Sequence, residues 1–193
     1  MKRIVLMIML CIPLFIFAQE KKYLPERDSS EKFRYYYSDI INVDNANSNE
    51  LYNRVKNFVS QEVKKTTNLL QDDKENGIVV IKGVRENRAN AQEKKKSYWR
   101  TTYGYFQLKI QVKDNRYKFT FEYPEIVQTS FSSLSPSLDK TTSFSFLVSQ
   151  KDNKDTDVNS TLYRSEFWSL NTDANIIINK LIKMMQTRSK DDF

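Results

Sequence analysis

The segment Tyr103–Tyr123, YGYFQLKIQVKDNRYKFTFEY, decides the fold. Apolar and polar residues alternate on both sides of Asp114-Asn115, a pair that favours a tight turn. Because successive side chains of a strand point to opposite sides, the segment predicts an antiparallel hairpin with one apolar and one polar face. The apolar face is expected to pair Val112 with Tyr117, Ile110 with Phe119, Leu108 with Phe121, and Phe106 with Tyr123.

The polar face of this hairpin carries the first set of candidate binding residues. A slip of one residue would mix polar and apolar side chains on both faces, so the register is well specified. We therefore expect a sheet with one face covered by helices and the other open to solvent or to a ligand. The candidate residues on the open sheet face are Lys109, Gln111, Lys118 and Thr120.

Two amphipathic helices are predicted to cover the apolar face. Asn47 and Glu50 form a capping-box pattern, and the apolar residues that follow recur at helical spacing over 48–67. A second apolar stripe predicts a helix over 173–187, capped by Thr172-Asp173.

The remaining segments complete a single α+β domain over 33–188. We predict a strand over 33–43, a charged connection over 71–76, a buried strand over 78–81, an exposed excursion over 85–97, a loose Ser/Thr-rich loop over 128–145, and an added strand within 142–150.

The N-terminus has the three-part form of a secretory signal peptide. Lys2 and Arg3 precede an apolar run from Ile4 to Phe17, and Ala18 supplies the small residue before the cleavage point. The run is shorter than the roughly 20 residues that cross a bilayer. We predict that 1–18 is removed, which leaves a flexible leader over 19–32, a polar tail over 189–193 and no transmembrane span. The exported protein would be periplasmic, associated with the outer envelope, or secreted.

The composition excludes several kinds of chemistry. The 193 residues include no His, one Cys and three Gly, so no His-based nucleophile system, imidazole metal site or glycine-rich phosphate loop is expected. We predict no catalytic residue, no metal and no cofactor. The formal net charge of +7 does not by itself indicate nucleic acid, and no nucleic-acid partner is expected.

A second candidate binding patch lies before the hairpin. Its basic and aromatic residues, which together could hold a polyanion, are Lys94, Lys95, Lys96, Trp99 and Arg100. The alternative, which we favour, is a solvated charged loop that Trp99 anchors to the core.

The whole pattern resembles a known family. The order of strand, helix, antiparallel strands and terminal helix, with the segments NELYNRVKNFV (49–59), DDKENGIVVIKG (72–83) and the hairpin, resembles a secreted bacterial domain family of unknown function with a TATA-binding-protein-like fold. The resemblance covers about 34–124. It implies a curved antiparallel sheet with two helices packed on one face, and it brings no catalytic residue and no ligand.

Three hypotheses of function follow. The first is an exported, non-catalytic binding module of the cell envelope, whose partner is a protein, a glycan or a lipid component. The second is a hydrolase or transferase that works without His or Cys chemistry. The third is a weak polyanion binder that uses the patch at 94–100.

Overall fold

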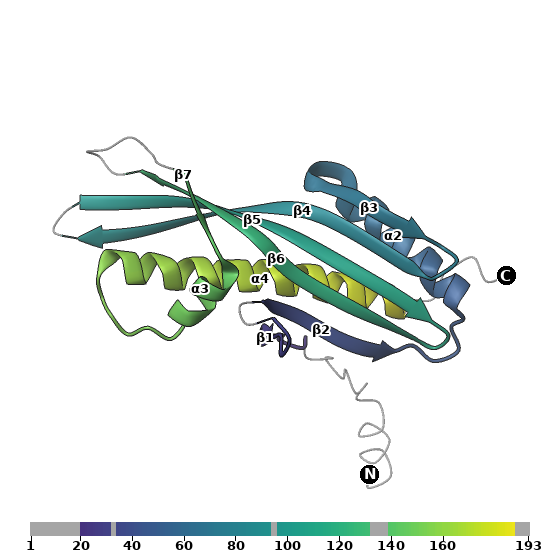
Figure 1. Cartoon of the computed structure of the whole chain (residues 1–193). Coiled ribbons are helices and arrows are strands. Elements are labelled where there is room, and N and C mark those ends of the chain that lie inside the picture. Colours follow the sequence, from purple (N-terminus) through teal and green to yellow (C-terminus); the bar gives the residue numbers. More distant parts are fainter. Residues whose placement is uncertain (1–19, 32–33, 94–95, 132–138, 188–193) are drawn as a thin grey trace, which may run out of the picture.

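The computed structural model describes residues 20–187 apart from 32–33, 94–95 and 132–138. The described residues form an open antiparallel sheet of seven strands and three helices, in an α+β arrangement (Figure 1). The strands are β1 (Glu26–Arg27), β2 (Tyr35–Asn42), β3 (Thr67–Asp73), β4 (Ile78–Glu93), β5 (Lys96–Lys113), β6 (Arg116–Phe131) and β7 (Asp139–Thr142). The helices are α2 (Ser48–Thr66), α3 (Phe144–Gln150) and α4 (Val158–Gln186). The predicted signal peptide and the predicted polar tail lie outside the described residues.

The strands follow the order β1-β2-β6-β5-β4-β3, and β7 also pairs with β6. β6 therefore changes partner along its length. Its first half, from Arg116 to Glu122, pairs with β2, and its second half pairs with β7 from Ile126 onward.

The hairpin of β5 and β6 confirms the register predicted from the alternation. Val112, Ile110 and Leu108 lie opposite Tyr117, Phe119 and Phe121. Asn115 in the turn has a φ of 60°, a conformation that Asn tolerates. The predicted pairing of Phe106 with Tyr123 is wrong, because a bulge between Tyr105 and Gln107 shifts the ladder at that point.

Both residues of the failed pair are nevertheless buried on the predicted face. Phe106 stacks on Phe121 with ring centroids 5.2 Å apart. The bulge places one extra residue in β6 and shifts the alternation beyond it by one, so that Ile126 and Gln128 point inward after Tyr123.

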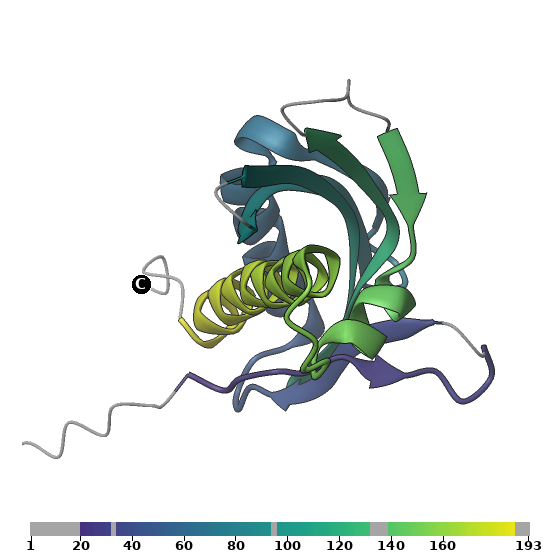
Figure 2. The same ribbon diagram turned by 90° about the vertical axis from the view of Figure 1, so that its left-hand side faces the viewer.

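α2 and α4 cover the apolar face, and the sheet curves around α4 (Figure 2). α2 begins as predicted, since the Asn47 side chain accepts a hydrogen bond from the Glu50 amide at 2.9 Å. The core between the two layers includes Leu51, Val55 and Phe58 from α2 and Ile177, Ile178 and Leu181 from α4. A third helix, the short α3, was not predicted.

The predicted exposed excursion over 85–97 is wrong, because β4 runs to Glu93 and β5 begins at Lys96. The inner face of this region presents Ala89 and Ala91, which pack with Leu162 of α4 in a small second core. Because these small residues lie among polar neighbours, the segment lacks the alternation of large apolar and polar residues by which a strand is predicted from sequence.

The predicted charged connection over 71–76 is also wrong in its first half, where β3 pairs with β4. The Asp72 carboxylate accepts hydrogen bonds from the Tyr52 hydroxyl and the Lys56 ammonium group of α2. These partners satisfy an acidic side chain that lies on the helix side of the sheet.

The predicted Ser/Thr-rich loop over 128–145 contains regular structure. β6 extends to Phe131, β7 follows at 139–142, and α3 replaces the strand predicted within 142–150. The Ser143 hydroxyl caps α3 by accepting from the Phe146 amide at 3.2 Å. The buried residues of α3 are Phe144, Leu147 and Val148, a helical spacing that alternation alone does not distinguish from a strand.

The last helix begins fifteen residues before the predicted start of 173. Asp157 caps α4 and accepts from the amides of Asn159 at 2.9 Å and Ser160 at 3.1 Å. Thr172 is not a cap, since its hydroxyl donates to the carbonyl of Trp168 within the helix at 2.8 Å.

The predicted flexible leader over 19–32 packs against the domain in its described part. The amide of Tyr23 donates to the Asn175 side chain at 2.7 Å, and its ring meets Phe119 edge-on at 5.5 Å between centroids. Tyr23 is part of the main core, so this segment is an integral part of the fold.

Within the described residues, no helix combines the length and the apolar character needed to cross a membrane.

Candidate functional site

The open face is the side of the sheet that points away from α2 and α4. Alternate residues of β5 define it, because their neighbours at Phe106, Leu108 and Ile110 point into the core. The predicted residues of this face lie together: Lys109 is opposite Thr120 and Gln111 is opposite Lys118.

A shallow groove of about 480 Å³ lies at one edge of the open face, where β1 and β2 meet β6. Ser38 and Thr120 supply hydroxyls to it, and Tyr36 supplies a ring; Ile40, an exposed apolar residue, lies opposite Lys118. The groove is lined by Glu26, Asp28, Arg34, Tyr36, Ser38, Asp39, Ile40, Lys118 and Thr120. Two of the four predicted residues of the open face thus line a depression.

An ion pair fixes the wall of this groove. The Arg34 guanidinium binds both oxygens of Glu122, with Nε–Oε2 at 2.7 Å and Nη2–Oε1 at 3.0 Å. Two parallel hydrogen bonds of this kind give orientation as well as energy. On the other side of Arg34, a second hollow of about 640 Å³ reaches Pro124 and Phe144. The Arg34–Glu122 pair therefore stands between two depressions.

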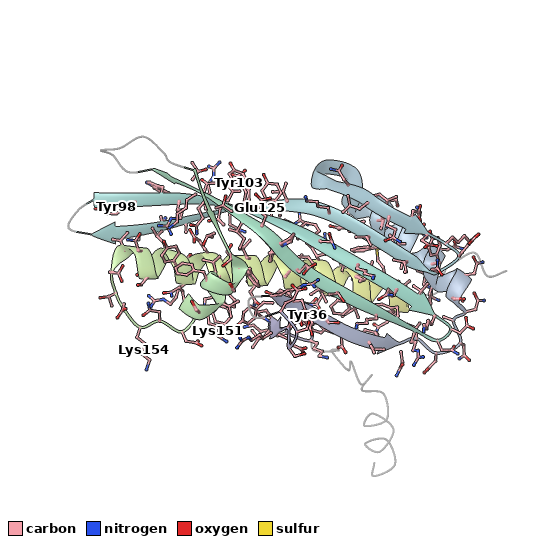
Figure 3. All side chains as sticks on the ribbon, in the orientation of Figure 1. Tyr36, Tyr98, Tyr103, Glu125, Lys151 and Lys154 are labelled. Carbon is pink, nitrogen blue, oxygen red and sulfur yellow. The ribbon has the colours of Figure 1, made fainter. Side chains whose placement is uncertain are left out.

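Aromatic side chains extend the open face along β5. Trp99, Tyr103 and Tyr105 alternate with inward residues, and the Trp99 side chain is 53% exposed. Figure 3 shows Tyr103 on β5 and Glu125 on the neighbouring β6, with Tyr36 further along on β2.

The second predicted patch is not a single surface. Lys94 and Lys95 lie outside the described residues, and Lys96 begins β5. Trp99 is on the open face, but Arg100 points to the helix side and is only 7% exposed. The prediction that Arg100 belongs to an exposed patch is wrong, because adjacent residues of a strand point to opposite faces. Trp99 does not anchor a loop to the core either, since it is exposed on a strand.

Arg100 belongs to a buried polar cluster between the sheet and α4. Its Nη1 lies 3.5 Å from Oε1 of Glu166, and its Nη2 donates to the Asn159 side chain at 3.1 Å. Gln128 donates to the other Glu166 oxygen at 2.6 Å, and the guanidinium lies 4.5 Å from the ring centroid of Tyr163. The cluster keeps a guanidinium group and a carboxyl group out of contact with water.

The environment shifts the pKa of Glu166. Burial raises the pKa of the Glu166 carboxyl above its ordinary value, and the Arg100 charge and the surrounding hydrogen bonds oppose that rise. Sequence reasoning missed Glu166 and Gln128, because a polar residue at one position of a helix or strand carries no sign that it points inward.

Among the residues that the structure describes, no three His, Cys, Asp or Glu side chains lie close enough together to hold a metal ion. Asp73, the last residue of β3, is held locally, since it accepts from the Asn76 amide at 3.0 Å and from the Asn76 side chain at 2.8 Å.

A curved antiparallel sheet with helices on one face defines an α+β protein of the TATA-binding-protein-like class. The family model described as domain of unknown function (DUF4468) with TBP-like fold matches residues 37–127. The match confirms the resemblance inferred from the sequence.

Two solved structures are similar to this chain. A TBP-like protein from Parabacteroides distasonis ATCC 8503 superposes with a TM-score of 0.59 at 14% identity, over 82% of this chain and 97% of that chain. A DUF4468 family protein from Bacteroides ovatus ATCC 8483 gives a TM-score of 0.49 at 9% identity, over 81% of this chain and 90% of that chain. No curated protein matches the sequence. The first of these likenesses shows the fold and names no ligand.

Proposed function

We propose that this protein is an exported, non-catalytic binding module of the cell envelope, and that it binds its partner with the open face of the sheet. The observation that carries the proposal is the open face itself. It spans the long strands β4, β5 and β6, and the helices α2 and α4 leave it uncovered.

The chemistry of the open face supports contact with a ligand. An exposed Trp and two half-buried Tyr share the face with amide, hydroxyl and ammonium groups, all on rigid strands. Aromatic side chains with a polar edge are enriched in binding surfaces, because they bury a large area with little loss of side-chain freedom. The groove beside Thr120 adds a recessed part to an otherwise exposed surface.

Export is supported by the pattern of residues 1–18, which has the basic, apolar and small-residue parts of a signal peptide. An exported binding module would meet envelope components such as glycans, lipids and other proteins.

The test blocks the open face without assuming what binds there. Thr120→Trp adds bulk on this face, and Thr172→Trp places the same change on an exposed position of α4. Labelled protein comprising 19–193 is sedimented with isolated cell envelopes of the source bacterium. We expect the parent protein and Thr172→Trp to sediment with the envelopes and Thr120→Trp to stay in solution. Equal sedimentation of the two variants, or none for the parent, would refute the proposal.

A further inference from the structure

Three lysines form a diagonal row across the open face. Lys82 of β4 lies opposite Gln107, and Lys109 is two residues further along β5. Lys118 of β6 lies opposite Gln111, two residues beyond Lys109. Diagonal neighbours in an antiparallel sheet are about 7–8 Å apart at their Cα atoms. The row therefore brings three ammonium groups to one side of three adjacent strands.

No carboxylate of the described residues forms an ion pair with this row. Glu122, opposite Gln107, has both of its oxygens bound by Arg34. Nearer to Lys118, Asp39 lies beside Ile40 in the groove and is bound by Lys21 at 2.5 Å, and Asp28 lies 4.0 Å from Arg34. Three like charges at this spacing repel one another, and the repulsion is relieved by an anion bound between them. The row is thus complementary to negatively charged groups.

Aromatic residues continue from the lysine row along the same strand. Three aromatic residues precede Gln107 on β5: Tyr105 by two residues, Tyr103 by four and Trp99 by eight. All three aromatic residues lie on the open face. At about 3.4 Å per residue, Trp99 and Lys109 are roughly 34 Å apart along β5. A ligand that contacts both ends is therefore an extended chain.

We propose that the open face binds an anionic polysaccharide that lies along β5. The carboxylate or sulfate groups of the polysaccharide contact Lys82, Lys109 and Lys118, and the faces of its sugar rings lie on Trp99, Tyr103 and Tyr105. This inference rests on the proposed function, since it names the ligand of the same surface.

The residues around the aromatic row distinguish a polysaccharide from a nucleic acid. Nucleic acid strands need a cation beside the stacked bases to hold their phosphates. Here the Tyr103 and Tyr105 positions face Glu86 and Glu125 on the adjacent strands, and Arg88 is paired with Glu86 at 3.0 Å. Glu86 and Glu125 repel any anion beside the aromatic row, so this row suits sugar rings whose hydroxyls donate hydrogen bonds to the carboxylates, while the anionic groups of the polysaccharide contact the lysine row. A nucleic acid strand has a phosphate beside every base and cannot leave the aromatic row free of charge. The apolar C–H face of a neutral sugar also buries area against a ring.

The experiment measures binding of protein 19–193 to polygalacturonate, hyaluronate and dextran sulfate, with neutral dextran and dodecathymidylate as comparisons. The test variant is Lys82→Gln/Lys109→Gln/Lys118→Gln. A control of equal charge change is Lys151→Gln/Lys154→Gln/Lys183→Gln, of which Lys151 and Lys154 lie in the loop between α3 and α4 (Figure 3). Trp99→Ala is compared with Trp168→Ala, a partly exposed Trp of α4. Circular dichroism establishes that each variant is folded.

We expect at least one of the three anionic polysaccharides to bind, and its affinity to fall as salt rises. The test variant should lose at least about tenfold in affinity at low salt and show a flatter salt dependence, because three charge contacts are removed. The control should stay within about twofold of the parent. Trp99→Ala should weaken binding by about tenfold, and Trp168→Ala should not.

Three outcomes would overturn the inference: no binding to any of the three anionic polysaccharides, tighter binding to dodecathymidylate, or equal losses in the two lysine variants. The envelope experiment separates this result from the wider proposal. A protein that sediments with envelopes through its open face but binds none of the three polysaccharides keeps the proposed function and loses its proposed ligand. A protein that does not sediment loses the proposed function.

Discussion

The guanidinium group of Arg100 lies 3.5 Å from the carboxylate of Glu166 between the sheet and α4, where the two residues are 7% and 1% exposed. A buried pair of this kind is costly to form, because both ions leave water. It is more costly to break, because one charge then remains buried without its partner.

Replacement of one partner should therefore destabilise the protein strongly. We expect Arg100→Ala to lower the free energy of unfolding by about 3–5 kcal/mol at neutral pH, since Glu166 is left without a cation. Arg88→Ala is the matched control, because Arg88 is an exposed arginine of the same sheet, and its change should cost about 0.5 kcal/mol or less. Urea denaturation of both variants measures the difference. Equal losses would show that the buried pair has no special role.

The pH dependence of stability should report Glu166. Its pKa in the folded protein is raised above the ordinary value of 4.5, so the folded state binds this proton more tightly than the unfolded state. The contribution of Glu166 to stability is thus present in acid and declines as the pH rises through the raised pKa. Glu166→Gln removes this titration, and the variant should gain stability relative to the parent as the pH rises from about 4 to about 7. Urea denaturation across this range tests the slope. A slope of the opposite sign would mean that Arg100 lowers the pKa more than burial raises it.

The one-sided sheet predicts unequal costs for neighbouring residues. Phe121 is fully buried, stacks on Phe106 and meets Tyr37 edge-on at 5.8 Å, so Phe121→Ala should cost about 3–5 kcal/mol. Thr120→Ala, on the open face, should cost about 0.5 kcal/mol or less. Denaturant unfolding of the two variants is the measurement, and similar losses would contradict a half-buried strand.

A glycine lies where the sheet packs tightly against α4. A Cβ atom at Gly104 would lie 2.5 Å from Cδ2 of Leu170 and 2.9 Å from Cε1 of Tyr123. Gly104→Ala should therefore destabilise the protein by about 1–3 kcal/mol through overpacking. Leu170→Val in the same chain shortens the opposing side chain and should recover part of the loss. A thermal or urea denaturation series of the single and double variants tests this, and an unchanged stability of Gly104→Ala would show that the helix yields easily.

Export predicts a defined N-terminus. If residues 1–18 are removed, intact mass spectrometry of the protein from its source bacterium should find a chain that begins at Gln19, outside the cytoplasm. A chain that retains Met1 to Ala18 in the cytoplasmic fraction would contradict the signal-peptide prediction.

The sequence predicted those parts of the fold in which apolar residues point to the core and polar residues point to solvent. The hairpin around Asn115 carries clear alternation and has the expected register as far as the bulge, and the helix after Asn47 carries clear helical spacing and begins where expected. Open-face residues such as Lys109 followed from the same alternation. These signals are local, so one sequence is enough to read them.

The sequence failed to predict those parts of the structure in which small or charged residues are buried. Ala89 and Ala91 are buried but too small to mark a strand, and Arg100 and Glu166 are buried but charged. Their positions depend on the contact between distant segments, β5 and the first turns of α4. Such partners give no periodic signal, and the buried cluster could therefore be found only in three dimensions.

The length of α4 has a consequence for how the protein opens. The C-terminal turns of α4 pack in the main core through residues such as Ile178, and its N-terminal turns pack through Leu162 on the two alanines of β4. The second contact buries little apolar area. The end of β4, the start of β5 and the end of β6 should therefore exchange their amide protons by a partial opening that costs less free energy than global unfolding. In that opening the N-terminal turns of α4 lose their contact with β4, while the C-terminal turns stay packed in the main core. A ligand bound along β5 would favour the closed state and so slow amide exchange in the N-terminal turns of α4, on the opposite side of the sheet from the ligand.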